Sequence, residues 1–171
     1  MDDIRAFNFF SHKPMELYAN YLTEEALRRD FYYAFSDKRY PGVPEINLNV
    51  IDDAPFHIGD MDIIPLEVWH MKMPVLGFRF GKFTYITDAN RMEEETKEKV
   101  RGSEVIVVNA LRREKHISHY NLQEAVELVR ELGIPRAYFT HISHQLGLHV
   151  AINSELPDGM ELAYDGLELE L

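Results

Sequence analysis

The sequence of 171 residues contains no cysteine. Disulfide bonds and thiolate chemistry are therefore excluded, and any metal ion would have to be bound by histidine and carboxylate side chains. No apolar run reaches membrane-spanning length, since the longest stretches, such as Val105–Val108, have the size of a strand. The first residues, Met1–Arg5, lack the basic and apolar regions of a signal peptide. These absences predict a cytoplasmic protein that does not enter a membrane.

Basic residues are in the minority, with 18 Lys and Arg against 29 Asp and Glu and a net charge of −11. Nucleic-acid binding depends on Lys and Arg side chains that neutralise phosphates, so this balance argues against a nucleic-acid partner. The hydrophobic fraction of 46% and the charged fraction of 27% are those of an ordinary globular protein. The length predicts a single domain over residues 1–171.

Hydrophobic periodicity predicts an α/β fold, with strands from residue 46 to 88 and alternating strands and helices after it. Pro65, inside an expected strand over 61–70, indicates an edge position or a bulge. Asn121 and Glu124 have the spacing of a capping box at the start of a helix that runs to Leu132. Three further helices are expected: over residues 2–10, after an N-cap at Thr23, and over residues 93–101. Strands are expected over residues 15–19, 47–51, 56–58, 77–80, 83–87, 104–109, 137–140 and around Val150. A hairpin is expected at Asp165-Gly166.

Three candidate ligands each follow directly after an expected strand: His70, Asp88 and His141. In sheets with crossover helices, ligands and catalytic groups gather at strand ends, where loops converge on a rigid frame. Imidazole and carboxylate are donors that zinc, manganese and iron accept, and a carboxylate can bridge two ions. Taken singly, each residue also fits a structural role, such as a packed strand-end histidine or an aspartate that caps a turn.

Four segments in order resemble the metallo-β-lactamase superfamily. They are residues Val68–Phe80, Tyr85–Asp88, Ser118–Ala125 and Phe139–His144. Within that superfamily they are most similar to the branch that holds the cyclic-phosphate phosphodiesterase of the carbon–phosphorus lyase pathway and the tRNA-maturing endonucleases. The resemblance covers about residues 60 to 165 and implies part of an αββα sandwich, its C-terminal portion, with mixed sheets flanked by helices.

The resemblance also implies roles for four residues. His70 would bind one divalent metal ion, zinc or manganese, Asp88 would bridge two ions, and His141 would bind the second. His119 would be the catalytic histidine beside the metals, where an imidazole can steady a phosphate oxygen or protonate a leaving alkoxide. The structural alternative for His119 is a histidine that packs against the following helix, because Asn121 is the better cap.

The chain departs from the family at its main metal motif. No His-x-His-x-Asp-His string occurs in the sequence, and Met1–Arg5 resembles the helix that follows that motif. Two metal ions need roughly four to six protein ligands, so three positions predict an open and weak site. Loss of part of a two-layer sandwich would also expose apolar sheet and favour a homodimer.

Three functions therefore compete. The first is a metal-dependent hydrolase, a phosphodiesterase in which a metal-activated water attacks a small phosphodiester or cyclic phosphate. The second is a catalytically incomplete half-domain that serves as a folding or interaction module. The third is an RNA-processing nuclease, against which the acidic charge and the absence of an evident tRNA-binding arm both count.

The remaining histidines carry less weight. His144 fits either a residue that orients a ligand or an ordinary loop position, and the loop position is preferred. His116 is a similarly weak candidate. His12, His57 and His149 are assigned structural roles.

Overall fold

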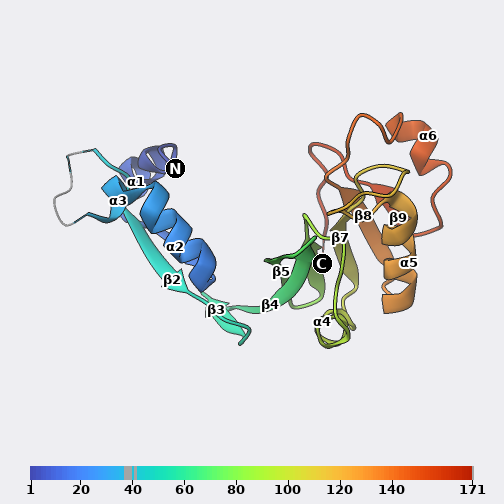
Figure 1. The fold of residues 1–171 in the computed structure, drawn as a ribbon, viewed down its shortest axis with the longest axis horizontal. Coiled ribbons are helices and arrows are strands. Elements are labelled where there is room, and N and C mark those ends of the chain that lie inside the picture. The colour runs from blue at the N-terminus through green and yellow to red at the C-terminus, as the bar shows by residue number, and fades with distance from the viewer. Residues whose placement is uncertain (37–39, 41, 171) are drawn as a thin grey trace. The chain divides into compact units, whose positions relative to one another are not determined.

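The computed structural model describes residues 1–36, 40 and 42–170, and its ribbon is drawn in Figure 1. By internal packing the chain divides into two compact units, Met1–Ala54 and Pro55–Leu171. Both units combine helices and strands, so the mixed α/β class expected from the sequence is confirmed. The expectation of a single domain over the whole chain stays a prediction.

The first unit contains a two-stranded parallel sheet whose strands are joined by helices. In it the Glu16 carboxylate accepts hydrogen bonds from the side-chain amides of Asn47 and Asn49, each at 2.7 Å, and these bonds lower its pKa. The elements are α1 (Ile4–Ser11), β1 (Met15–Ala19), α2 (Tyr21–Asp30), α3 (Tyr32–Phe35) and β2 (Ile46–Val50).

Helix α2 begins earlier than its sequence predicts. Asn20, not Thr23, is the N-cap, and its side-chain oxygen accepts a hydrogen bond from the backbone N–H of Thr23 at 2.9 Å. Asparagine and threonine both cap helices, and asparagine ranks slightly higher. The expected N-cap at Thr23 was therefore wrong by one turn, because the better cap lies three residues upstream.

The second unit is built on a seven-stranded sheet in the order β3-β4-β5-β6-β7-β8-β9. Neighbouring strands pair antiparallel from β3 to β6, and from β6 to β9 they pair parallel. Such a mixed sheet flanked by helices agrees with the predicted fold class. Its elements are β3 (Phe56–Ile58), β4 (Met61–His70), β5 (Met73–Phe80), β6 (Phe83–Ile86), α4 (Glu94–Val100), β7 (Val105–Asn109), α5 (Leu122–Leu132), β8 (Arg136–Thr140), α6 (His149–Asn153) and β9 (Met160–Leu162).

At Pro65, β4 is paired with one described strand, β5. Strand β3 pairs with β4 at Met61–Ile63, whereas β5 pairs with it as far as His70. Proline has no backbone N–H to donate to a ladder, so it is tolerated on the unpaired side of a strand. β4 is an inner strand of the sheet, and the edge position that the sequence indicated holds only locally at Pro65, beyond the ladder with β3.

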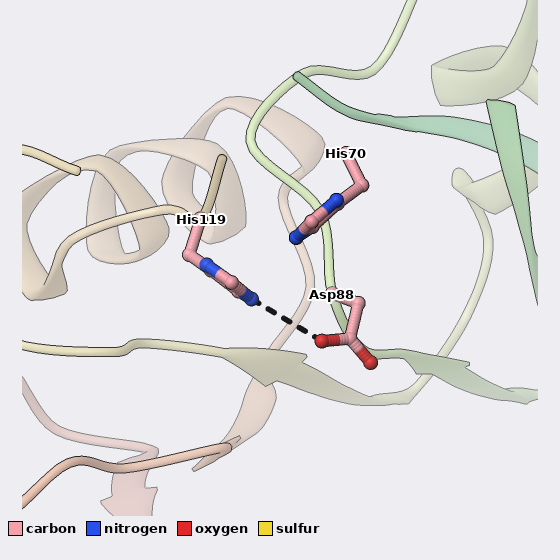
Figure 2. A group of neighbouring side chains, drawn as sticks. All are labelled: His70, Asp88 and His119. Atoms are coloured by element: carbon pink, nitrogen blue, oxygen red, sulfur yellow. Dashed lines mark hydrogen bonds and ion pairs between the residues drawn. The ribbon is translucent and has the colours of Figure 1, made fainter. Parts of the chain in front are cut away.

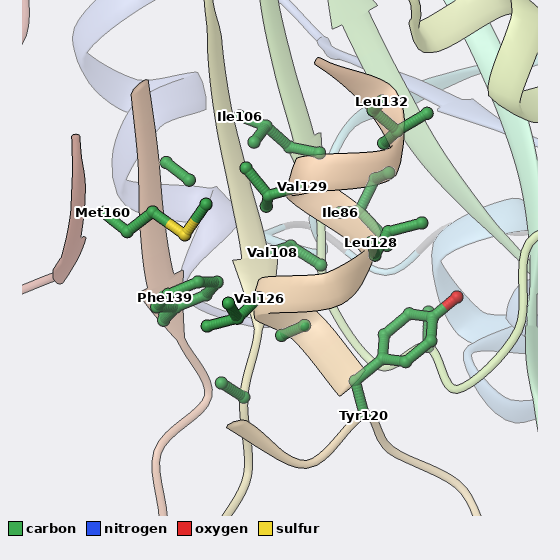
Figure 3. Packing of buried hydrophobic residues seen from close by; sticks show 14 of the residues in the cluster. Ile86, Ile106, Val108, Tyr120, Val126, Leu128, Val129, Leu132, Phe139 and Met160 are labelled. Carbon is green, nitrogen blue, oxygen red and sulfur yellow. The ribbon is translucent and has the colours of Figure 1, made fainter. Parts of the chain in front are cut away.

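The core of the second unit lies between α5 and the parallel strands (Figure 3). Every residue of β7 is buried, as expected for a parallel strand that is covered on both faces. Figure 3 shows Val126 and Val129 of α5 facing the strands that carry Val108 and Phe139. This packing fixes the strand ends from which the loops of the site emerge.

Replacing Asn121 with alanine should lower the free energy of unfolding by about 1 kcal/mol. The Asn121 side chain accepts from the Glu124 N–H at 2.8 Å, and the Glu124 carboxylate accepts from the Asn121 N–H at 3.0 Å, which confirms the capping box. Urea denaturation measures the loss. Asn121→Asp, which keeps an acceptor, is the control, and an equal loss in both variants would show that the cap contributes nothing.

Two expectations near the C-terminus were wrong. The residues around Val150 form helix α6, in which Ile152 is buried and Val150 is 81% exposed. The segment after β9 forms a turn at Asp165-Gly166 but no strand over residues 163–170. β9 pairs in parallel with β8 instead. Local β-propensity was overridden in both places by the partners available in the folded chain.

None of the helices in the described part of the chain has both the length and the apolar character to cross a membrane.

Candidate metal centre

The candidate site lies at one edge of the seven-stranded sheet. β4 and β6 are each antiparallel to β5, so they run in the same direction, and β7 and β8 are parallel to β6. The C-terminal ends of these strands therefore meet at the same edge. His70 is the last residue of β4, Asp88 follows β6, and His141 follows β8. The structure thus brings together three side chains that are far apart in the sequence.

Two of these residues have a left-handed backbone, with φ of 54° at Asp88 and 57° at His141. Residues other than glycine rarely adopt this conformation, although aspartate and histidine are enriched in it. It turns the chain sharply at the strand end. The turn after Asp88 is held by Asn109, whose side chain accepts from the Ala89 N–H and donates to the Ala89 carbonyl, each at 2.9 Å. Asn109 is fully buried.

Asp88 is the centre of the cluster. Its Oδ1 lies 3.2 Å from His119 Nε2 and 3.3 Å from His141 Nε2. Figure 2 shows the side chains of His70, Asp88 and His119 gathered together. One ligand atom of each lies within 4.8 Å of the others. Three imidazoles therefore surround one carboxylate.

His119 comes from the loop that precedes α5. The N–H of its neighbour Tyr120 donates to the Ala89 carbonyl at 2.8 Å, which ties this loop to the turn after Asp88. The N–H of Leu111, after β7, donates to the Tyr120 carbonyl at 3.0 Å. The His119 side chain is only 11% exposed, against 47% for Asp88 and 38% for His141. His119 thus lies at the buried side of the cluster.

The electrostatics of the cluster favour an ionised Asp88 beside a neutral His119. Burial tends to raise the pKa of Asp88, but the hydrogen bond from His119 and the charge of His141 outweigh it, and the pKa is lowered. Burial lowers the pKa of His119, and the neighbouring His141, His70 and His116 add to this effect against the opposing bond to Asp88. Neutral imidazole and carboxylate are the forms that bind a metal ion.

His116 is a neighbour of the site to which sequence reasoning gave little weight. Its Nδ1 lies 3.1 Å from His119 Nδ1, and the ring centroids are 5.0 Å apart. Ser118 Oγ lies 3.0 Å from the same His119 nitrogen. The spacing His116-x-x-His119 directly before a helix cap was the signal in the sequence that could have identified it.

The other histidines lie elsewhere. His144 is exposed in the loop after β8. His57 pairs with Asp62 across the β3–β4 hairpin at 2.6 Å, and His149 Nε2 lies 3.1 Å from the Leu162 carbonyl oxygen. His12 ends α1 with a left-handed backbone. These positions agree with the structural roles expected for His12, His57 and His149.

The donor set fits a divalent metal ion. Three ligand atoms lie within the span of one coordination sphere, and His141 supplies a fourth next to Asp88. Nitrogen and carboxylate oxygen without thiolate suit zinc and manganese alike. A catalytic zinc site uses three protein ligands and keeps one position open for water or substrate, which this number of donors allows.

Comparison with known proteins identifies the family. The pattern of the beta-lactamase superfamily domain matches residues 1–142. The chain therefore belongs to this superfamily, as its motifs indicated.

Individual relatives share most of this chain. A diphosphatase of the PhnP family is 32% identical in its crystal structure, with a TM-score of 0.88 over 99% of this chain and 65% of that one. A protein from Porphyromonas gingivalis named octanoyltransferase is 31% identical over 170 residues, which are 98% of this chain and 34% of that protein. Zn²⁺-bound PqqB from Methylobacterium extorquens is 16% identical, with a TM-score of 0.65 over 98% of this chain and 68% of that one, and shares the fold. The chain thus spans less than two thirds of the length of the PhnP-family diphosphatase and of the octanoyltransferase.

Proposed function

We propose that this chain is a metal-dependent hydrolase that cleaves a phosphodiester or a related phosphorus–oxygen bond in a small molecule. The observation that carries the proposal is the convergence of three imidazoles on the Asp88 carboxylate at one edge of the sheet. The diphosphatase of the PhnP family, 32% identical, supports phosphorus–oxygen cleavage as the reaction class. The octanoyltransferase name belongs to a protein of which this chain matches 34%, so that activity is not carried over to this chain.

His70, Asp88 and His141 would hold the ion, zinc or manganese. A divalent metal ion supplies Lewis acidity, which lowers the pKa of a water molecule and neutralises charge on phosphate oxygens. Asp88 holds the neighbouring imidazoles in place through its contacts of 3.2 and 3.3 Å. His119 directs Nε2 at the Asp88 carboxylate, 3.2 Å away, and from this position it would donate a hydrogen bond to a phosphate oxygen or a proton to the leaving alkoxide.

The number of donors predicts one ion per chain. The three ligands His70, Asp88 and His141 suffice for a single catalytic site, whereas two ions need roughly four to six protein ligands, and the sequence lacks the His-x-His-x-Asp-His motif. Plasma-emission spectrometry after dialysis against zinc or manganese measures the content. Hydrolysis of bis(p-nitrophenyl) phosphate measures turnover. A chain that retains no metal and hydrolyses nothing would refute the proposal.

His119→Ala should lower turnover of bis(p-nitrophenyl) phosphate by about a hundredfold or more, the range expected for loss of general acid–base catalysis. The metal content should stay at the wild-type level, because His119 acts on the substrate. His144→Ala, at an exposed histidine of a neighbouring loop, is the matched control. A parallel loss of metal and turnover would place His119 among the ligands and contradict its catalytic role.

A second candidate function, an interaction module that forms a homodimer, is favoured by exposed aromatic side chains on α1. Phe7, Phe9 and Phe10 are 59%, 73% and 79% exposed. Exposed apolar patches of this kind commonly meet a partner. The combined change Phe9→Ser and Phe10→Ser should shift the chain from dimer to monomer in sedimentation velocity. A monomeric wild-type chain would exclude the dimer.

A further inference from the structure

Two loops flank the metal centre, and they differ in how firmly they are anchored. The His141 loop, residues 141–148, connects β8 to α6 and is fixed in the core by the buried side chain of Leu146. The His119 loop, residues 110–121, connects β7 to α5, and four of its residues between 113 and 117 are exposed. Exposed segments with few buried apolar contacts open most readily. The middle of the His119 loop therefore depends on polar contacts to hold it in place.

Arg112 supplies such contacts from within the His119 loop. Its Nη1 donates to the side-chain Oε1 of Gln145, in the His141 loop, at 2.8 Å. Its Nη2 donates to the Lys115 carbonyl at 3.3 Å, and its own carbonyl accepts from the Leu122 N–H at 2.9 Å. One guanidinium thus ties the middle of the His119 loop to the anchored His141 loop. A planar fork of fixed N–H donors suits this double contact, which a lysine ammonium cannot reproduce.

Folding stability does not account for this placement of Arg112. Its Nε is buried and has no hydrogen-bond partner among the described residues. A buried donor without a partner costs free energy, and departures of this kind are typical of functional sites. The adjacent Arg113 is exposed and pairs with Glu155, which lies outside both loops, at 2.5 Å. Of these two neighbouring arginines, Arg112 is the one that links the loops.

We propose that Arg112 is a positioning residue that fixes the His119 loop against the His141 loop and so holds His119 at the metal centre. One side of His119 is fixed by its neighbour Tyr120, whose N–H donates to a carbonyl in the turn after Asp88 at 2.8 Å. Arg112 fixes the other side through the carbonyl of Lys115, four residues before His119. With both sides held, the His119 ring keeps its place beside the metal ligands. The catalytic consequence rests on the proposed hydrolase function.

The first test measures the loop itself and needs no activity. Amide hydrogen exchange is followed by NMR on the full ¹⁵N-labelled chain without added metal. In Arg112→Met, which keeps the apolar stem and loses the guanidinium, the Tyr120 and Leu122 amides should exchange about tenfold faster or more, the factor expected for loss of a charged hydrogen bond. Arg113→Met is the matched control and should leave both rates unchanged, because an exposed ion pair contributes little. Wild-type exchange of both amides in Arg112→Met would overturn the inference.

The second test uses zinc or manganese with bis(p-nitrophenyl) phosphate. Arg112→Met should lower kcat about 10- to 100-fold, the range for a catalytic group that is out of place. KM and metal content should stay at the wild-type level, because Arg112 touches neither substrate nor ion in this role. Arg113→Met should keep the wild-type kcat, and far-UV circular dichroism confirms that the variants fold. Equal kcat in the wild type and Arg112→Met would contradict the positioning role.

Variants of the partner separate positioning from a direct effect of charge. Gln145→Leu removes the acceptor and should also lower kcat, whereas Gln145→Glu keeps an acceptor and should retain kcat. The double variant of Arg112→Met with Gln145→Leu should lose no more than Arg112→Met alone, since both changes remove the same contact. Arg112→Lys keeps the charge without the fork and should stay impaired. Wild-type kcat in Arg112→Lys would show that charge alone suffices and would reject the positioning role.

The two tests can fail independently. Faster exchange in Arg112→Met, together with no hydrolysis by the wild type, would reject the proposed function and retain the role of Arg112 in holding the loop. Hydrolysis by the wild type, together with unchanged exchange and unchanged kcat in Arg112→Met, would retain the proposed function and reject the role of Arg112.

Discussion

Asp88→Ala is expected to abolish metal binding and hydrolysis together. Metal content should fall at least tenfold and turnover of bis(p-nitrophenyl) phosphate at least about 100-fold, because metal affinity and activity both depend on this ligand. Asp88 is the carboxylate that the structure places among three imidazoles. Without it the donors are three neutral or cationic rings, which repel one another when protonated and leave the charge of a divalent ion uncompensated.

Two further variants test whether the Asp88 carboxylate itself causes the losses expected in Asp88→Ala. Asp88→Asn keeps the shape of the side chain and tolerates the left-handed backbone at φ 54°, yet removes the charge, so it should behave like Asp88→Ala. Asp165→Ala removes an exposed carboxylate in a turn and should retain metal and turnover. Wild-type metal content in Asp88→Asn would show that the carboxylate is not a ligand.

Phe139→Ala should cost about 3–5 kcal/mol of the free energy of unfolding, the largest loss expected from a single substitution in the core. Phe139 is fully buried, in β8, between Val108 of β7 and Leu162 of β9. Its removal deletes a large apolar surface and leaves a cavity that rigid neighbouring strands cannot fill. Urea unfolding monitored by circular dichroism measures the difference.

A matched aromatic residue provides the control. Tyr85, in β6, is 43% exposed, so Tyr85→Ala should cost well under half of that amount. Since β8 carries His141 at its end, Phe139→Ala should also weaken metal retention. Equal destabilisation by both variants would show that the core is not centred on β8.

Much of the fold could be predicted from local patterns. The capping box at Asn121 and Glu124 was visible because caps act within one turn. The buried strand Val105–Asn109 was visible because a parallel strand covered on both faces is apolar at every position. Patterns that depend on distant partners were not visible, and for this reason the residues around Val150 form a helix where a strand was expected.

The sequence by itself determined which residues could bind a metal ion and that they follow strands. With no cysteine the donors had to be histidine and carboxylate, and the strand-end positions of His70, Asp88 and His141 follow from short-range periodicity. Only the tertiary structure decided that these strand ends share one edge, that His119 approaches Asp88 to 3.2 Å, and that His116 lies against His119. Strand direction and sheet order are set by packing between segments far apart in the chain, and local sequence patterns carry no record of them.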